Sequence, residues 1–181
     1  MYRGRLFVAL AAAALLLCAG GTAPVRAQSS GGEGRDVDAR IQLLVGAVVR
    51  VRAQALDDAR SNATLGQGRE GSGIVIDEEG HILTIGYLVI EPDRIEVTTA
   101  ANRTVPATLA GYDHATGFGL LKAQAPLGVK PLPLGDSAAL GVREPVMIVP
   151  FGGRENASMA YVVSTRRFSG SWEYLLDSAI F

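Results

Sequence analysis

The 181-residue sequence contains very little cysteine, histidine or lysine. Its single cysteine, Cys18, lies in an N-terminal segment that we expect to be removed on export, so the mature chain has no disulfide and no thiolate ligand. The two histidines, His81 and His114, are isolated from each other, are expected to be ordinary exposed residues, and form no zinc-like spacing. The composition therefore predicts no metal, no cofactor, and a fold stabilised by a hydrophobic core.

The chain also lacks any excess of positive charge. It has 17 basic and 18 acidic residues, and only Lys122 and Lys130 are lysines. Three arginines and no acid lie in residues 1–27, so the remainder carries 14 basic and 18 acidic residues, a net charge of −4. This balance argues against a nucleic-acid partner or an anionic membrane surface. Together with many alanines and glycines, the scarcity of lysine favours a bacterial source.

Long apolar runs are missing except near the N-terminus. The run at 6–19 has 14 residues, whereas a membrane-spanning helix needs about 20. Arginines precede the run, and Val25-Arg26-Ala27 offers small residues before Gln28, which predicts a Sec-type signal peptide over 1–27 and a periplasmic or secreted protein. Lipidation of Cys18 is the weaker alternative, because Leu17 stands where a small residue is expected.

The remaining sequence is organised as short β-strands. Residues 28–35 are polar and glycine-rich, which is typical of a linker, and 36–45 predict a short helix. A largely polar stretch at 54–70 predicts a surface loop. The expected strands cover 48–53, 71–77, 81–85, 94–100, 104–111, 117–123, 146–149, 161–163 and 174–180, with a proline-containing edge segment at 126–134. Short strands at regular spacing favour an all-β barrel.

The most informative stretch is 71–90, GSGIVIDEEGHILTIGYLVI. It predicts a β-hairpin whose acidic turn, 77–80, ends at Gly80, a residue free to adopt a positive φ. We expect this turn to be a solvated loop tip rather than a metal site. Ser72 lies between glycines at the start of a strand, not on the strand-to-helix turn of hydrolases, so we expect close backbone packing there instead of a nucleophile.

This hairpin resembles the first barrel of trypsin-like serine proteases, in particular the HtrA/Deg branch. In that branch a GSG-x-x-[IV]-D-x-x-G-x-I-L-T hairpin leads to the catalytic histidine, three residues after the threonine and before two apolar residues. Here the threonine is Thr84 and the apolar pair is Leu88-Val89. The residue at the histidine position is Tyr87.

A second segment, 110–122, is similar to the family motif that contains the catalytic aspartate. Asp113, Thr116 and residues 118–122 match the motif, and Gly117 stands at the aspartate position. Further matches occur at 133–137 and 176–180. The family's nucleophile loop follows the second of these segments, so the resemblance implies that the serine position lies beyond Phe181.

The resemblance implies a trypsin-like (chymotrypsin-type) double β-barrel, with a complete first barrel within 36–140 and a partial second barrel within 141–181. A phenol with a pKa near 10 is a poor base at pH 7, and Gly117 has no side chain, so no catalytic residue is intact. The sequence therefore favours a pseudoprotease that binds peptides or a partner protein.

Two alternatives remain at this point: a fragment of an active HtrA/Deg-like serine endopeptidase, and an exported remnant without a function. A partial second barrel also implies that another subunit or a longer chain completes it.

Overall fold

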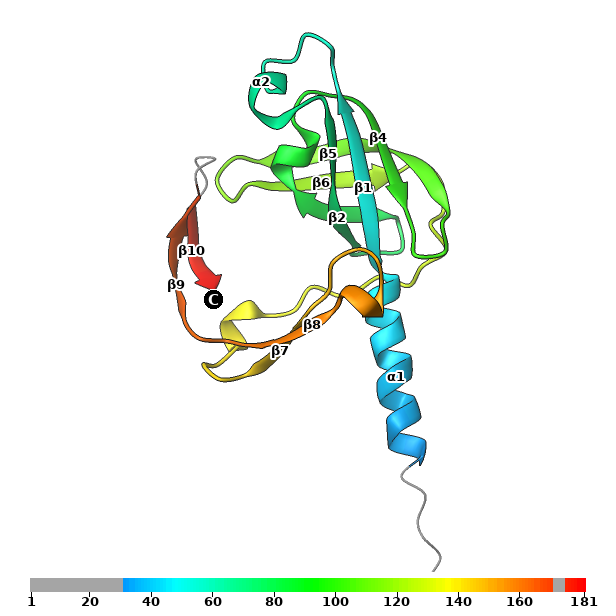
Figure 1. Cartoon of the computed structure of the whole chain (residues 1–181), viewed down its shortest axis with the longest axis vertical. Helices are drawn as coiled ribbons and strands as arrows, with labels where there is room; N and C mark the ends of the chain where they lie inside the picture. Colours follow the sequence, from blue (N-terminus) through cyan, green and yellow to red (C-terminus); the bar gives the residue numbers. More distant parts are fainter. Residues whose placement is uncertain (1–30, 171–174) are drawn as a thin grey trace, which may run out of the picture.

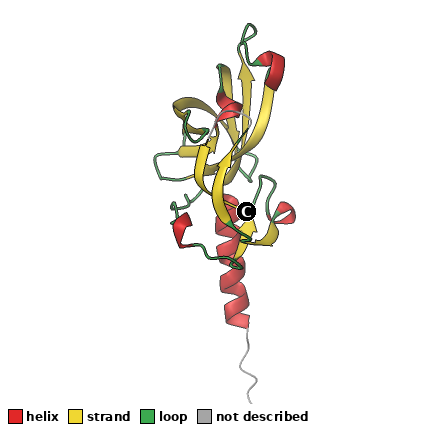
Figure 2. Ribbon diagram, turned by 90° about the vertical axis from the view of Figure 1, so that its left-hand side faces the viewer, coloured by secondary structure: helices red, strands yellow, loops and turns green. Residues whose placement is uncertain are grey.

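The structure is a computed structural model that describes residues 31–170 and 175–181. The expected signal peptide, its cleavage site before Gln28 and Cys18 lie outside the described residues. The first described element is a helix, α1 (Gly31–Gly46), which leads into the first strand and projects away from the sheets (Figures 1 and 2). Within the described part of the chain, no helix is long and apolar enough to cross a membrane.

Helix α1 begins earlier than the sequence predicts. The described part of the expected linker, 31–35, is helical. Once residues 36–46 form a helix, each residue added at the N-terminus gains a hydrogen bond without a new nucleation cost. Composition alone does not capture this effect, because glycine and serine are poor helix formers in isolation.

Six antiparallel strands form a closed barrel in the order β1-β2-β3-β6-β5-β4 (Figure 1). The strands are β1 (Val48–Ala55), β2 (Gly68–Val75), β3 (His81–Ile85), β4 (Pro92–Thr98), β5 (Thr104–Asp113) and β6 (Phe118–Ala123). A 3₁₀ helix, η1 (Gly86–Val89), follows β3. The closed sheet has no free edge, and it confirms the predicted first barrel.

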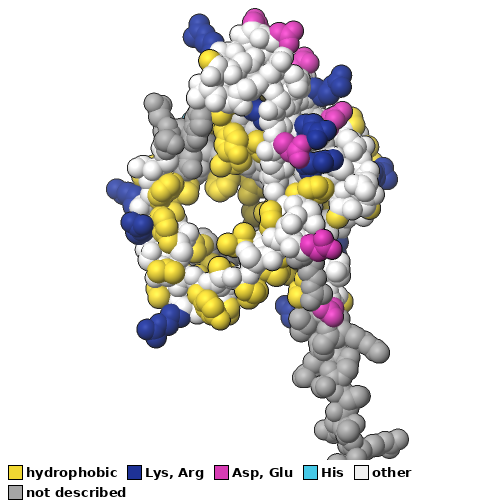
Figure 3. All heavy atoms as spheres, viewed as in Figure 1, with side chains coloured by type: hydrophobic (Ala, Val, Ile, Leu, Met, Phe, Trp, Pro, Cys, Tyr) yellow, Lys and Arg dark blue, Asp and Glu magenta, His cyan; other side chains and the backbone are white. Residues whose placement is uncertain are grey.

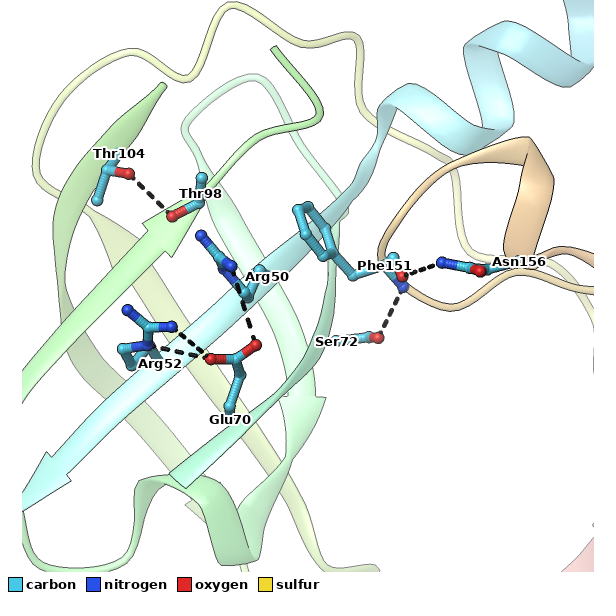
Figure 4. A network of polar contacts seen from close by, with 8 residues as sticks. All are labelled: Arg50, Arg52, Glu70, Ser72, Thr98, Thr104, Phe151 and Asn156. Atoms are coloured by element: carbon cyan, nitrogen blue, oxygen red, sulfur yellow. Dashed lines mark hydrogen bonds and ion pairs between the residues drawn. The ribbon is translucent and has the colours of Figure 1, made fainter. Parts of the chain in front are cut away.

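Alternating side chains along β1 separate the core from the outer surface. Val49 and Val51 are fully buried, whereas Arg50 and Arg52 point outward on either side of Glu70 (Figure 4). Arg52 Nη2 lies 2.7 Å from the Glu70 carboxylate. This period of two is the pattern from which the half-buried strand was predicted.

The glycine pair that flanks Ser72 permits close packing of β2. A Cβ atom on Gly73 would lie 2.6 Å from Ile82 Cγ2 and 2.8 Å from Val51 Cγ2. Ser72 is exposed, and its hydroxyl accepts a hydrogen bond from the Phe151 backbone N–H at 2.9 Å (Figure 4). The expectation of a close-packed strand at this serine is therefore confirmed.

Two connecting segments differ from the prediction. The expected loop at 54–70 is shorter, because β1 continues to Ala55, β2 begins at Gly68, and a helical turn, α2 (Asn62–Leu65), lies between them. The expected edge segment at 126–134 has no strand pairing. Leu132 donates its N–H to Val75 O at 2.9 Å, and the prolines of this segment have no N–H to extend a ladder.

The C-terminal region forms two separate hairpins, with four strands where the sequence predicts three. Strands β7 (Pro145–Ile148) and β8 (Ser158–Tyr161) form one two-stranded sheet, and β9 (Thr165–Ser169) and β10 (Leu175–Ile180) form the other. Short 3₁₀ helices, η2 (Ser137–Ala139) and η3 (Arg154–Asn156), precede and interrupt them. Strand β9 was not predicted, because all five of its residues are exposed and show no alternation.

Apolar side chains of these hairpins gather around an open space between them and the barrel (Figure 3). The sequence predicts partly exposed side chains at Val146, Ile148, Val162 and Leu176. Three of these are intermediate or exposed, with Ile148 at 56%. Val162 is buried, contrary to the expectation. It exchanges two backbone hydrogen bonds with Arg143 and Glu144, which hold it inside the base of the hairpin.

Candidate functional site

The structure brings together the two positions at which the family resemblance places the histidine and the aspartate. Tyr87 lies in η1, immediately after β3, and packs partly buried against the barrel core. Gly117 lies in the turn between β5 and β6. The Gly86 N–H donates to Gly117 O at 2.7 Å, so the two turns are in direct contact.

The backbone at Gly117 is unsuited to an aspartate. Its φ is +74°, in the left-handed region that favours glycine, and its N–H donates to Asp113 O at 2.8 Å. A side chain at this position would therefore strain the tight turn that connects β5 to β6.

The neighbouring carboxylate, Asp113, is engaged in its own turn. One oxygen accepts the Thr116 hydroxyl at 2.5 Å and the other accepts the Ala115 N–H at 2.9 Å. These hydrogen bonds, the one from Thr116 first, lower the pKa of Asp113. Asp113 therefore anchors the turn that ends at Gly117 and does not point an unengaged carboxylate toward Tyr87.

An aromatic ring packs on the chain next to Tyr87. A Cβ atom on Gly86 would overlap the ring of Tyr112, so glycine is required for this contact. The Tyr112 ring also meets His114 edge-on, with centroids 4.5 Å apart. His114 is exposed, as expected. Sequence reasoning did not single out Gly86 or Tyr112, although Tyr112 directly precedes the matched Asp113.

A surface hollow of about 390 Å³ opens beside η1. Its lining comes from the end of η1 and the two residues after it, and from β5 and the residue after it, and consists of Val89, Ile90, Glu91, Leu109, Tyr112 and His114. The lining is mostly apolar, and Leu109 is 39% exposed. The hollow is therefore an accessible apolar surface beside the 3₁₀ helix that contains Tyr87.

The acidic turn of the β2–β3 hairpin is more ordered than predicted. Asp77 accepts the His81 N–H at 2.9 Å, and its other oxygen lies 2.6 Å from His81 Nδ1. The backbone hydrogen bond from His81 is the main cause of the lowered pKa of Asp77. Ligand atoms of Asp77, Glu79 and His81 lie within 4.8 Å of one another, although Asp77 and His81 are already paired.

His81 is thus half-buried rather than fully exposed, and it closes the hairpin turn. Gly80 adopts φ +82° in this turn, as predicted. His81 begins β3 and Tyr87 follows the end of that strand, so the histidine does not belong to the site at Tyr87.

Comparison with known proteins assigns the family. Residues 71–180 match the trypsin-like peptidase domain family, and the chain belongs to it. Two solved structures of the HtrA-type protease AlgW with tripeptide share the fold, with TM-scores of 0.61 and 0.58 at 18% sequence identity. They align with 77% and 72% of this chain, and with 43% and 40% of theirs.

Curated relatives are HtrA/Deg-type proteases. Serine protease PepD of Mycobacterium tuberculosis is 30% identical over 62% of this chain and 28% of its own length. Protease Do-like 1, chloroplastic, of Arabidopsis thaliana is 32% identical over 54% and 23%. A probable periplasmic serine endoprotease DegP-like of Pseudomonas putida is 38% identical over 45% and 17%. The chain thus spans less than a third of these relatives.

Proposed function

We propose that this chain is a non-catalytic member of the trypsin-like peptidase family that binds a polypeptide at the face carrying Tyr87. The observation that carries the proposal is the pair Tyr87 and Gly117, which occupy adjacent turns joined by the Gly86–Gly117 hydrogen bond. The protein scaffold of the site is retained, whereas the side chains that would perform acyl transfer are replaced.

The chemistry explains why this replacement removes activity. Acyl transfer in this family needs a serine hydroxyl, an imidazole that accepts its proton, a carboxylate that orients the imidazole, and amides that bind the oxyanion. A neutral phenol at position 87 is a poor proton acceptor at pH 7. Gly117 offers no carboxylate, and Asp113 is held by Thr116 and Ala115.

The hollow beside η1 supports a peptide as the ligand. It is mostly apolar and open to solvent, and it has room for one large apolar side chain. The structural relative AlgW is described with a tripeptide, which favours the same class of ligand here. In this proposal an apolar side chain of the peptide contacts Leu109 and Tyr112.

We further propose that the protein acts in the periplasm or outside the cell. The N-terminal pattern of arginines, apolar run and small residues before Gln28 supports export. The Pseudomonas putida relative is described as probably periplasmic, which agrees with this assignment.

A second candidate is an active HtrA/Deg-like serine endopeptidase of which this sequence is a part. The observation that favours it is the coverage of the relatives, of which the chain spans 17% to 28%. The two candidates differ in whether an additional chain segment carrying the nucleophile restores turnover despite Tyr87 and Gly117.

Peptidase activity of this chain tests the absence of turnover, and the same assay on a chain extended by the segment that carries the nucleophile distinguishes the two candidates. The purified protein is incubated with casein and with a chromogenic peptide ester, with and without a serine-directed phosphonate. We expect the unmodified protein to show no phosphonate-sensitive turnover. The double variant Tyr87→His with Gly117→Asp should show none either. Phosphonate-sensitive turnover by the unmodified chain would refute the proposal.

Binding is tested with a library of fluorescent apolar peptides. Leu109→Asp places a charge in the hollow, whereas Leu134→Asp changes an exposed leucine outside its lining. We expect Leu109→Asp to weaken peptide binding by about tenfold or more, because the bound peptide would bury the new carboxylate. Leu134→Asp should leave peptide binding unchanged. Equal affinities of the two variants would place the peptide elsewhere.

A further inference from the structure

A buried arginine lies behind the turn that carries Tyr87. Arg69 of β2 is only 5% exposed, and a buried charge is tolerated only when its donors are satisfied. Its guanidinium donates to Tyr87 O at 3.1 Å and to Ile90 O at 2.7 Å. It also donates to Gly66 O at 3.1 Å and to Ser61 Oγ at 2.6 Å.

The residue after this turn is held by the same network. Glu91 has φ +50°, an unfavourable backbone conformation that requires fixed surroundings. Its carboxylate accepts the Ser61 N–H at 3.0 Å and the Ser61 hydroxyl at 2.6 Å. Its carbonyl accepts the Leu56 N–H at 3.0 Å.

The charges in the network support one another. The hydrogen bonds from Ser61 are the main cause of the lowered pKa of Glu91, and the positive charge of Arg69 lowers it further. Burial lowers the pKa of Arg69, and Glu91 opposes this effect. The Ser61 hydroxyl donates to Glu91 and accepts from Arg69, so it connects the two charges.

We propose that Arg69 is a positioning residue that fixes the turn 86–91 and, through it, Tyr87 and the wall of the hollow. The guanidinium contacts two carbonyls of the turn and two atoms of the 61–66 segment at the same time. Lysine has one ammonium on a flexible stem and cannot replace this planar set of donors. Only the consequence for peptide binding rests on the proposed function.

Hydrogen exchange measures the order of the turn without any ligand. Arg69→Met and Arg69→Lys are compared with Arg52→Met, which removes an exposed arginine that pairs with Glu70 on the outer face. The reporting amides are Gly86, bonded to Gly117, and Leu56, bonded to Glu91. We expect both Arg69 variants to accelerate exchange at these amides by about tenfold or more, because methionine offers no donor to the buried carbonyls and lysine cannot replace the planar set of donors.

The reference in the same experiment is the exchange of amides in β1 and β6. These should remain protected in all three variants. Equal acceleration throughout the barrel, or unchanged exchange at Gly86 and Leu56, would overturn the proposal. If Arg69→Met fails to fold, Ser61→Ala takes its place: it retains Arg69 and removes the connecting hydroxyl, and it should accelerate the Leu56 amide more than the β1 amides.

A spectroscopic signal of Tyr87 tests positioning more directly. In protein labelled with 3-fluorotyrosine, the ¹⁹F resonance of Tyr87 is assigned by its loss in Tyr87→Phe. We expect it to shift and broaden in both Arg69 variants and to stay unchanged in Arg52→Met. An unperturbed resonance in Arg69→Met, or full rescue by Arg69→Lys, would contradict a positioning role.

Peptide affinity of the same variants separates this inference from the proposed function. Weakened peptide binding in both Arg69 variants, with unchanged binding in Arg52→Met, supports the positioning role of Arg69 and the proposed function together. A mobile turn with undiminished affinity overturns the role of Arg69 in binding. If the unmodified protein binds no peptide but the Arg69 variants still mobilise the turn, the proposed function fails and the fixing of the turn by Arg69 stands.

Discussion

The barrel and the C-terminal hairpins contain similar apolar residues, but the barrel buries them whereas the hairpins leave many of them exposed. In the barrel, Val51, Ile82 and Leu121 are fully buried. In the hairpins, Met159 and Tyr161 are 68% and 67% exposed, although β8 is as well paired with β7 as neighbouring barrel strands are with each other. Figure 3 shows the apolar side chains of this region around an open space.

The difference lies in closure of the sheet. The six barrel strands pair on both sides, so every strand contributes one face to a shared core. Each hairpin pairs only with itself among the described strands, and a two-stranded sheet is marginal in water. Apolar residues therefore stabilise the barrel, where they leave water, and contribute little in the hairpins, where they remain exposed.

The largest expected difference concerns hydrogen exchange of a protein comprising residues 28–181. Barrel amides should exchange only by global opening, whereas those of residues 145–181 should exchange by local opening. We expect protection factors that differ by about a thousandfold or more, since most of the barrel's stability is absent from the hairpins. A monodisperse monomer with both regions equally protected would show that the comparison is wrong.

Truncation of one leucine in each region should give the next largest difference. Leu121→Ala removes a fully buried side chain and should cost about 2–5 kcal/mol of unfolding free energy. Leu175→Ala removes a side chain that is 47% exposed and should change it by about 0.5 kcal/mol or less. Urea unfolding followed by circular dichroism measures both. Similar losses would mean that the hairpins contribute a core of their own.

Much of the barrel follows from local sequence patterns. Alternation at 48–53 predicts β1, and the acidic turn with Gly80 predicts the β2–β3 hairpin, because both features depend on neighbouring residues. The positions of Tyr87 and Gly117 follow from the motifs in which they stand. Their direct contact through Gly86 depends on barrel closure, which only the structure shows.

The features that were missed depend on distant partners. Arg69 lies in a polar stretch that predicts a surface loop, yet its partner Tyr87 O is 18 residues away. Strand β9 contains Arg166 and Arg167 and no buried residue, so its pairing with β10 has no period-two signal. The contact of Tyr112 with Gly86 likewise has no local signature.

A smaller effect is expected for Gly117→Asp in the barrel. At φ +74° a non-glycine residue costs about 1–2 kcal/mol, so this change should lower the unfolding free energy by that amount. The matched control is Gly135→Asp, because Gly135 has open space around its Cα and no positive φ. Thermal unfolding measures both. An equal effect of the two substitutions would mean that the backbone conformation of Gly117 does not disfavour an aspartate at this position.

The smallest effect is a pH dependence that arises in the barrel. The ordinary pKa of an aspartate is 3.8, and hydrogen bonds from Thr116 and Ala115 lower that of Asp113 in the folded protein. A carboxyl with a lowered folded pKa contributes stability that is fully present above the unfolded pKa and is lost as pH falls through the folded pKa. The difference in urea midpoint between the unmodified protein and Asp113→Asn should therefore be constant near neutral pH and shrink below about pH 4.

Thr116→Val removes the donor that contributes most to this shift, so its destabilising effect should shrink over the same pH range. Leu175→Ala in β10 supplies the comparison from the hairpins, because no titrating group is changed and its small effect should not vary with pH. An Asp113→Asn difference that stays constant from pH 6 to about pH 3 would mean that the Thr116–Asp113 hydrogen bond does not favour the charged carboxylate in solution.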